Sequence, residues 1–172
     1  AARVAFPSLV HVGDQIIIDD TNIIQLTFPN LLEAGSIKIF RTATEHIIFP
    51  SLREVYLDLA IEVSQPQTLV VSAPQLRVIK RNLQIANNSI TGTEFPLLTE
   101  VGGFIFVGNT AAYRDFSAPR LLHVGGKIRF SHNLALESLE LAFDTLEFMR
   151  IEQNPALHSF HFTGLKSAAV LQ

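Results

Sequence analysis

Acidic and histidine residues recur along the chain at a spacing that could bring several of them together. Glu33 and Glu54 occupy equivalent positions in successive stretches of about 22 residues, and His11 occupies that position before them. Neighbouring carboxylates can share general acid and general base roles, and an imidazole beside them could complete a metal site. The alternative is an exposed polar row at a corner of the fold. The full series is His11, Glu33, Glu54, Val78, Glu100 and His123.

Other residues with catalytic chemistry are sparse. His158 and His161 are three residues apart, which in a strand points them to opposite faces, so they cannot easily hold one metal ion. The chain has no cysteine, which excludes disulfides, thiolate metal sites and cysteine nucleophiles. We therefore expect no catalytic residue, no metal and no cofactor. A carbohydrate-active enzyme that uses Glu33 and Glu54 is an alternative.

The composition predicts one folded domain with a large apolar core. Of the 172 residues, 48% are hydrophobic and 17% charged, which is typical of a packed chain and not of a disordered one. The formal net charge is -3, and the sequence shows no cluster of Lys and Arg of the kind that neutralises a nucleic-acid backbone. We therefore expect no nucleic-acid partner. No apolar run reaches the roughly 20 residues of a membrane span. We expect residues 1–172 to form a single solenoid domain that is a segment of a longer protein.

A tetrapeptide repeat of the form Phe-Pro-x-Leu shows how the chain is organised. Repeats with periods of 20 to 50 residues are the signature of stacked, solenoid architectures. Clear copies begin at Phe6, Phe28, Phe49 and Phe95, and weaker copies begin at Ala73, Ala118, Phe143 and Phe162. The repeat therefore predicts an all-β solenoid, a parallel β-helix of about seven coils of about 22 residues.

In several coils a glycine corner leads into a strand, and the third coil, around residues 56–59, keeps the strand pattern without the glycine. Val12-Gly13, Val101-Gly102-Gly103 and Val124-Gly125-Gly126 each precede an apolar alternation. Glycine at this corner permits a positive φ or a bulge, and a period of two sends alternate side chains inward. The predicted inward pairs include Ile16/Ile18, Ile37/Ile39, Leu83/Ile85, Phe104/Phe106, Ile128/Phe130 and Met149/Ile151.

An amide or hydroxyl side chain follows each strand by a constant interval. A side-chain amide at a fixed corner can bond to the free backbone groups of its own coil and of the next one. This pattern predicts a polar ladder formed by Asn88, Asn109, Asn133 and Asn154, with Thr21 and Thr42 in the earlier coils. Asn87 begins an Asn-Asn-Ser glycosylation sequon, which would be used only if the protein follows a secretory route.

The combination of an apolar-Pro-x-Leu corner, Val-Gly-Gly, an alternating strand and asparagine resembles the receptor L-domain superfamily. The closest matching stretches are residues 101–109 and 124–133. Members include the ligand-binding L domains of growth-factor receptor ectodomains and fungal GPI-anchored cell-wall proteins. The resemblance implies a right-handed, leucine-rich-repeat-like β-helix at the cell surface. A bacterial or protist leucine-rich surface protein is an equal alternative.

The outward row of the first strand is the candidate ligand-binding surface, because solenoids commonly bind partners on a sheet face. Its basic end, with Ile105 and Val107 as apolar residues facing water, is typical of an interface anchor. A solvated sheet face with incidental charges is the alternative. The candidate residues are Ile17, Lys38, Gln84, Ile105, Lys127, Arg129 and Arg150, and Asp58 is placed in the same row.

These patterns favour a non-enzymatic recognition or adhesion module that binds a protein or glycan partner. We expect it to be extracellular or at a cell surface. A structural coat or cell-wall component that self-associates through the solenoid ends is the second hypothesis. The carbohydrate-active enzyme is the third.

Overall fold

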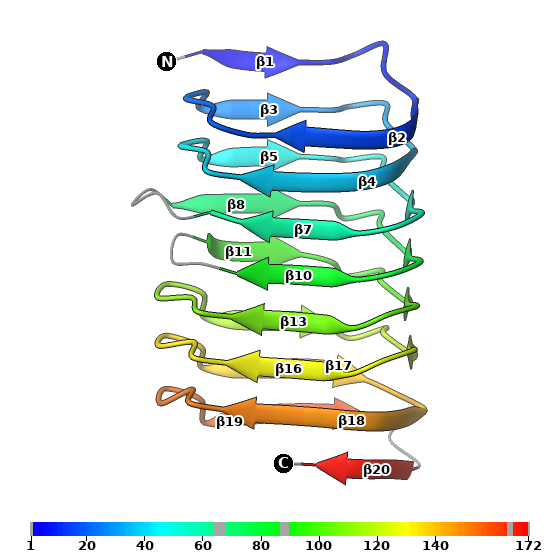
Figure 1. Ribbon diagram of the computed structural model, residues 1–172, viewed down its shortest axis with the longest axis vertical. Helices are drawn as coiled ribbons and strands as arrows, with labels where there is room; N and C mark the ends of the chain where they lie inside the picture. The colour runs from blue at the N-terminus through cyan, green and yellow to red at the C-terminus, as the bar shows by residue number, and fades with distance from the viewer. Residues whose placement is uncertain (1, 64–67, 87–89, 165–166, 172) are drawn as a thin grey trace.

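Each turn of the chain crosses the molecule twice, once in a front sheet and once in a back sheet (Figure 1). The computed structural model describes residues 2–63, 68–86, 90–164 and 167–171, with side chains described through residue 164. All regular elements of these residues are strands. Seen from the N-terminal end, the chain runs clockwise as it recedes, so the molecule is a right-handed parallel β-helix of about seven turns. The predicted fold class is confirmed.

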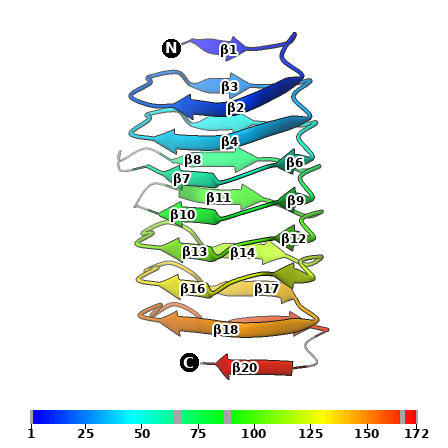
Figure 2. The same cartoon turned by 45° about the vertical axis from the view of Figure 1, so that its right-hand side comes forward.

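The front sheet has twelve strands, all parallel. The strands that cross the front face are β2 (His11–Ile18), β4 (Glu33–Phe40), β7 (Leu59–Glu62), β10 (Leu83–Ala86), β13 (Ile105–Gly108), β16 (Ile128–Ser131), β18 (Thr145–Glu152) and β20 (Ser167–Leu171). Four short strands stack along one edge of this face (Figure 2): β6 (Glu54–Val55), β9 (Val78–Ile79), β12 (Glu100–Val101) and β15 (His123–Val124).

The back of the molecule consists of two shorter parallel sheets. The first contains β1 (Arg3–Ala5), β3 (Gln25–Thr27), β5 (His46–Ile48), β8 (Leu69–Ser72) and β11 (Ile90–Glu94). The second contains β14 (Asp115–Ala118), β17 (Ser138–Ala142) and β19 (Ser159–Thr163).

The core is a set of apolar columns between the front and back sheets. Parallel pairing places Leu83 between Leu59 and Ile105, and it places Ile128 after Ile105 in the same column. These side chains are all buried. Because each turn can bury its apolar face only against its neighbours, the stack is stabilised as a continuous unit.

The Phe-Pro-x-Leu motif and its weaker copies form a tight turn at the end of six back strands, β1, β3, β5, β8, β11 and β14. The amide of Leu52 donates to the carbonyl of Phe49 at 3.4 Å, and the amide of Leu98 donates to that of Phe95 at 3.2 Å. Proline suits the second position of such a turn, because its φ is fixed and it has no N–H to satisfy. In the clear copies after the first, the phenylalanine and leucine point inward and are buried, whereas Phe6 of the first copy is 43% exposed.

The corner glycines are required for close packing between turns and not for a positive φ. A Cβ built on Gly125 would lie 2.2 Å from the carbonyl oxygen of Gly102, and one on Gly102 would lie 2.2 Å from that of Lys80. Among the described glycines, the one with a positive φ is Gly164, which lies outside these corners. The predicted positive φ was therefore wrong. The predicted bulge is supported in the first turn, where the pairing register shifts between Val12 and Gln15.

Candidate binding surface

Six of the seven candidate residues face outward on the front sheet, and one does not. Ile17 is 53% exposed, and it pairs with Lys38 in the next turn. Ile105 is buried, so its assignment to the surface was wrong, and Val107 is buried as well. The six confirmed outward-facing residues are Ile17, Lys38, Gln84, Lys127, Arg129 and Arg150.

A shift of one residue in this turn explains the error. Phe106 pairs with Gln84 on one side and with Arg129 on the other, so Phe106 occupies the outward place assigned to Ile105. The residue equivalent to Gln84 in the preceding turn is Ala60 and not Asp58. The signal was available in the sequence, because Gly102-Gly103-Phe104-Ile105 aligns without gaps with Gly125-Gly126-Lys127-Ile128.

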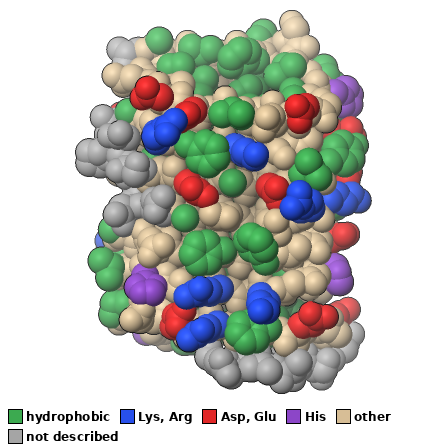
Figure 3. All heavy atoms as spheres, viewed as in Figure 1, with side chains coloured by type: hydrophobic (Ala, Val, Ile, Leu, Met, Phe, Trp, Pro, Cys, Tyr) green, Lys and Arg blue, Asp and Glu red, His purple; other side chains and the backbone are tan. Residues whose placement is uncertain are grey.

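Two outward rows meet on the last turns of the front sheet and form what we call the basic aromatic surface. Three phenylalanines and three cations lie there on successive turns, with one row in the order Phe, Lys, Phe and the other in the order Phe, Arg, Arg. In Figure 3, hydrophobic side chains gather over this part of the front face with Lys and Arg side chains directly beside them. The members are Phe104, Phe106, Lys127, Arg129, Phe148 and Arg150.

Two of the cations lie over rings of adjacent turns. The Lys127 ammonium is 5.5 Å from the centre of the Phe148 ring, and the Arg129 guanidinium is 6.0 Å from that of Phe106. At exposed positions such contacts contribute about 0.5 to 1 kcal/mol each. Among the described residues no cation lies over Phe104, whose side chain is 38% exposed.

A hollow of about 550 Å³ opens beside the Phe104 ring. Gly103 and Gly126 form part of its lining, and the absence of side chains at these positions leaves the backbone accessible between the rings and the cations. Asn82 and Gln84 border it on one side, and Lys127 and Arg129 border it on the other. The hollow therefore combines an aromatic wall, amides and positive charge.

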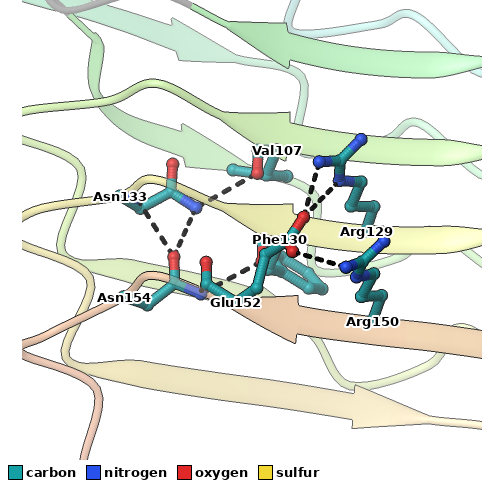
Figure 4. Close-up of polar contacts among 7 residues, drawn as sticks. All are labelled: Val107, Arg129, Phe130, Asn133, Arg150, Glu152 and Asn154. Atoms are coloured by element: carbon teal, nitrogen blue, oxygen red, sulfur yellow. Dashed lines mark hydrogen bonds and ion pairs between the residues drawn. The ribbon is translucent and has the colours of Figure 1, made fainter. Parts of the chain in front are cut away.

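One carboxylate is shared by two arginines at the edge of this surface (Figure 4). Glu152 Oε1 accepts from Arg129 Nε at 3.0 Å, and Glu152 Oε2 lies 3.0 Å from Arg150 Nη2. Within the described residues, no carboxylate lies at ion-pair distance from Lys127. The surface thus retains an excess of positive charge on a chain whose formal net charge is -3.

The predicted ladder lies behind this surface and fixes the ends of its strands. The Asn133 amide donates to the carbonyl of Val107 at 3.1 Å and to Asn154 Oδ1 at 2.9 Å, as Figure 4 shows. Asn154 donates to the carbonyl of Phe130 at 3.0 Å. The ladder is therefore confirmed at Asn133 and Asn154.

The ladder continues through a threonine and not through Asn109. Thr110 Oγ1 donates to Asn133 Oδ1 at 2.8 Å, whereas Asn109 is exposed with a φ of 57°. The prediction for Asn109 was wrong because of the same one-residue shift that misplaced Ile105: Thr110, and not Asn109, is equivalent to Asn133. In the first turns the hydroxyl oxygens of Thr21 and Thr42 are 2.6 Å apart and share a hydrogen bond, which agrees with the predicted ladder. Asn87 and Asn88 lie outside the described residues.

The acidic and histidine column forms as predicted, but Glu33 and Glu54 each have their own polar partners. Glu33 accepts from the Tyr56 hydroxyl at 2.9 Å and lies 3.4 Å from His11 Nδ1. Glu54 lies 3.2 Å from the Lys80 ammonium. The hydrogen bond to Glu33 is the main cause that raises the pKa of the Tyr56 phenol. Among the described residues, no three His, Cys, Asp or Glu side chains form a group able to hold a metal ion.

The remaining candidate histidines are exposed and separate. His158 Nδ1 is 2.8 Å from the carbonyl of Ala156, and His161 lies on β19 beside Glu140 of β17. Neither faces the basic aromatic surface, which belongs to the front sheet.

Comparison with known proteins finds no matching family model, no matching curated protein and no matching solved structure. No helix long and apolar enough to cross a membrane occurs among the described residues.

Proposed function

We propose that this chain is a non-enzymatic recognition module that binds a protein or glycan partner, extracellularly or at a cell surface, through the basic aromatic surface. The observation that supports this most directly is Phe104, a large exposed ring beside Lys127 and Arg129 at the mouth of a hollow. Exposed aromatic residues next to arginine are enriched at the centres of binding sites, where the exclusion of water increases the contribution of each contact to the binding free energy.

The rigidity of the scaffold also supports binding. The strands that present the surface are joined to the turns on both sides, and the ladder of Asn133 and Asn154 holds their ends. The backbone of a sheet of this kind loses little further freedom when a partner binds, which favours affinity. The receptor L-domain resemblance points to the same role, and we propose membership of that group on the basis of the corner motifs.

A paired substitution on one face tests the proposal. Phe104→Ser with Arg129→Glu alters the basic aromatic surface, while Ile17→Ser with Lys38→Glu makes the same kinds of change at the other end of the same sheet. Labelled protein would be applied to arrays of glycans and of cell-surface proteins. We expect the first pair to abolish the strongest binding and the second pair to preserve it. Equal binding by both pairs, or no binding by the unaltered chain, would reject the proposal.

A second candidate function is self-association through the first turn, as in a structural coat or wall component. The Phe6 ring stacks on Phe28 at 5.0 Å and is 43% exposed, and a hollow of about 420 Å³ lies beside it. Phe6 and Ile17 therefore present apolar surface of the kind that forms interfaces. Sedimentation velocity over a wide concentration range should show association that Phe6→Ser abolishes. A monomer at every concentration would exclude this function.

A further inference from the structure

The hollow beside Phe104 has a shape suited to a flat, partly apolar ring. Its floor includes backbone at Gly103 and Gly126, and a Cβ on Gly126 would lie 3.1 Å from the Gly103 carbonyl oxygen, so the floor has little room for side chains. The Phe104 ring forms one wall, and no cation of the described residues covers its face. A ring-shaped ligand with C–H groups on one face can pack against such a wall and displace its water.

The charge at the hollow selects an anion. Lys127 and Arg129 border it, and the carboxylate beside them, Glu152, is already engaged by Arg129 and Arg150. On the opposite side Asp58 and Glu62 accept hydrogen bonds from Asn82 and Gln84, so the cations and these carboxylates lie on different sides of the hollow. Arg129 uses Nε and Nη2 for Glu152, which leaves Nη1 unbonded among the described residues. A ligand carboxylate there would receive charge-assisted hydrogen bonds from both cations.

The amides on the opposite side provide hydroxyl recognition. Asn82 is committed to the fold, because its amide donates to Asp58 at 2.8 Å and its oxygen accepts from the Phe104 amide at 3.0 Å. Gln84 donates to Glu62, and its carbonyl oxygen accepts no hydrogen bond from the described residues. Gln84 lines the hollow, so this oxygen provides an acceptor beside it for a ligand hydroxyl.

Together these groups point to a saccharide that carries a carboxylate. We propose that the hollow binds an acidic saccharide of the uronic acid class, with its ring on Phe104 and its carboxylate between Lys127 and Arg129. This inference rests on the proposed recognition function and narrows it to one ligand class. Poly-glutamate could satisfy the cations but has no ring to pack against the aromatic wall, so it separates charge from ring recognition.

The spacing of the turns extends the argument to a polymer. Neighbouring parallel strands lie about 4.8 Å apart, which is comparable to the length of one pyranose residue. Arg129 and Arg150 pair directly across β16 and β18, one turn apart. A uronate chain along the solenoid axis would therefore meet a cation at successive turns, and oligomers should bind more tightly than the monosaccharide.

The experiment titrates the isotope-labelled chain with uronate oligomers and follows backbone amide signals by NMR. The probes are short oligomers of galacturonate, mannuronate and glucuronate, the methyl-esterified galacturonate oligomer, and poly-glutamate. The variants are Phe104→Ser and Lys127→Met, and the matched control is Lys38→Met, which removes one outward cation from the same sheet on β4. Thermal unfolding of each variant checks that the fold is retained.

We expect at least one uronate oligomer to shift the Gly103 and Gly126 amide signals saturably, with binding that weakens as salt is added. Loss of a charge-assisted hydrogen bond should make Lys127→Met bind about tenfold more weakly, with Lys38→Met unchanged. Phe104→Ser and the methyl ester should also weaken binding about tenfold or more.

Three results would overturn the inference: no saturable shift with any uronate, equal binding of poly-glutamate, or equal weakening by Lys38→Met. If the array experiment finds a protein partner that requires Phe104 and Arg129 while no uronate binds, the proposed recognition function is retained and the proposed uronic acid ligand is rejected. If neither experiment detects binding, both proposals fail.

Discussion

Single polar residues at the corner after each front strand determine how one turn is held to the next. A residue with a positive φ comes first, such as His132 at 57°, and the ladder residue follows it directly. The turn in the backbone aims the next side chain along the stack. The Asn133 side chain donates to the Val107 carbonyl and accepts from the Thr110 amide of the preceding turn, and it donates to Asn154 Oδ1 of the next turn. Asn133 is fully buried, so water cannot reach its amide or the groups bonded to it. These hydrogen bonds are therefore needed to satisfy polar groups that would otherwise have no partner.

Substitution of Asn133 by Leu should reduce the free energy of unfolding by about 2 to 4 kcal/mol, because it leaves buried groups of Val107 and Thr110 without partners. Asn109→Gly is the matched control, since glycine adopts a positive φ readily and the Asn109 side chain is exposed. Its effect should stay within about 0.5 kcal/mol. Chemical denaturation followed by circular dichroism measures both changes, and similar losses for the two variants would contradict the ladder assignment.

The two tyrosines of the chain should ionise in clearly different ways. Tyr113 is fully buried and bonds to the Thr93 hydroxyl at 2.5 Å, and burial raises the pKa of its phenol far above the usual value. The folded state therefore keeps a proton that the unfolded state loses above about pH 10, so stability is constant below that pH and falls above it.

Phenolate absorbance near 295 nm checks this prediction. Tyr56→Phe should show no phenolate signal until the protein unfolds in alkali, while Tyr113→Phe should show the smooth titration of exposed Tyr56. A smooth native titration of Tyr113 would contradict its burial.

At the level of the strand, the close approach of neighbouring turns at Gly102 and Gly125 fixes the entry to β13 and β16. The backbone of Gly125 passes so close to Gly102 that no side chain fits between them. The strands β13 and β16 then begin in equal register, which brings Phe106 beside Arg129 and makes the basic aromatic surface continuous across turns. The local packing of glycines thus determines which side chains meet on the outer face.

Gly125→Ala should lower the free energy of unfolding by about 3 kcal/mol, since its Cβ would lie 2.2 Å from a backbone oxygen that cannot move independently. Gly13→Ala occupies the equivalent corner of the first turn, where no atom lies within 4 Å of the added Cβ. We expect that variant to change stability by less than about 1 kcal/mol. Thermal or urea unfolding compares them, and equal effects would show that crowding is not the reason for the glycines.

The stacking of turns predicts that local stability differs between the centre and the ends of the molecule. Contacts run between neighbouring turns, so a central turn is covered on two sides and a terminal turn on one. At the corner phenylalanine, Phe49 of a later turn is 1% exposed, whereas Phe6 of the first turn is 43% exposed. Stability should therefore vary along the axis.

Hydrogen exchange tests this gradient. Backbone amides of β7 to β13 should exchange most slowly, because their opening requires separation of turns on both sides, and those of β1 and the start of β2 should exchange fastest. Mass spectrometry of peptide fragments gives the profile. Uniform protection from the first turn to the centre would show that the molecule opens as a single unit.

The sequence predicted the architecture because its strongest signals, the Phe-Pro-x-Leu turn and the period of about 22 residues, are local and repeated. The prediction failed where hydrophobicity does not show which residues of a strand face inward. Residues 104–107 are Phe-Ile-Phe-Val, so all four are apolar and the alternation that separates inside from outside disappears. The resulting shift of one residue misplaced Ile105 and Asn109 together. The hollow beside Phe104 could not be predicted either, since it depends on side chains from three turns.

The constant register between turns means that the length of this molecule can change in discrete steps. Phe104 and Lys127 occupy the same place in successive turns, so removal of residues 105–127 would join Phe104 to Ile128 and recreate an ordinary strand entry. An in-frame duplication of the same segment would lengthen the stack by about 4.8 Å. Such a gene can evolve a longer or shorter protein by copying whole turns, with every remaining turn unchanged.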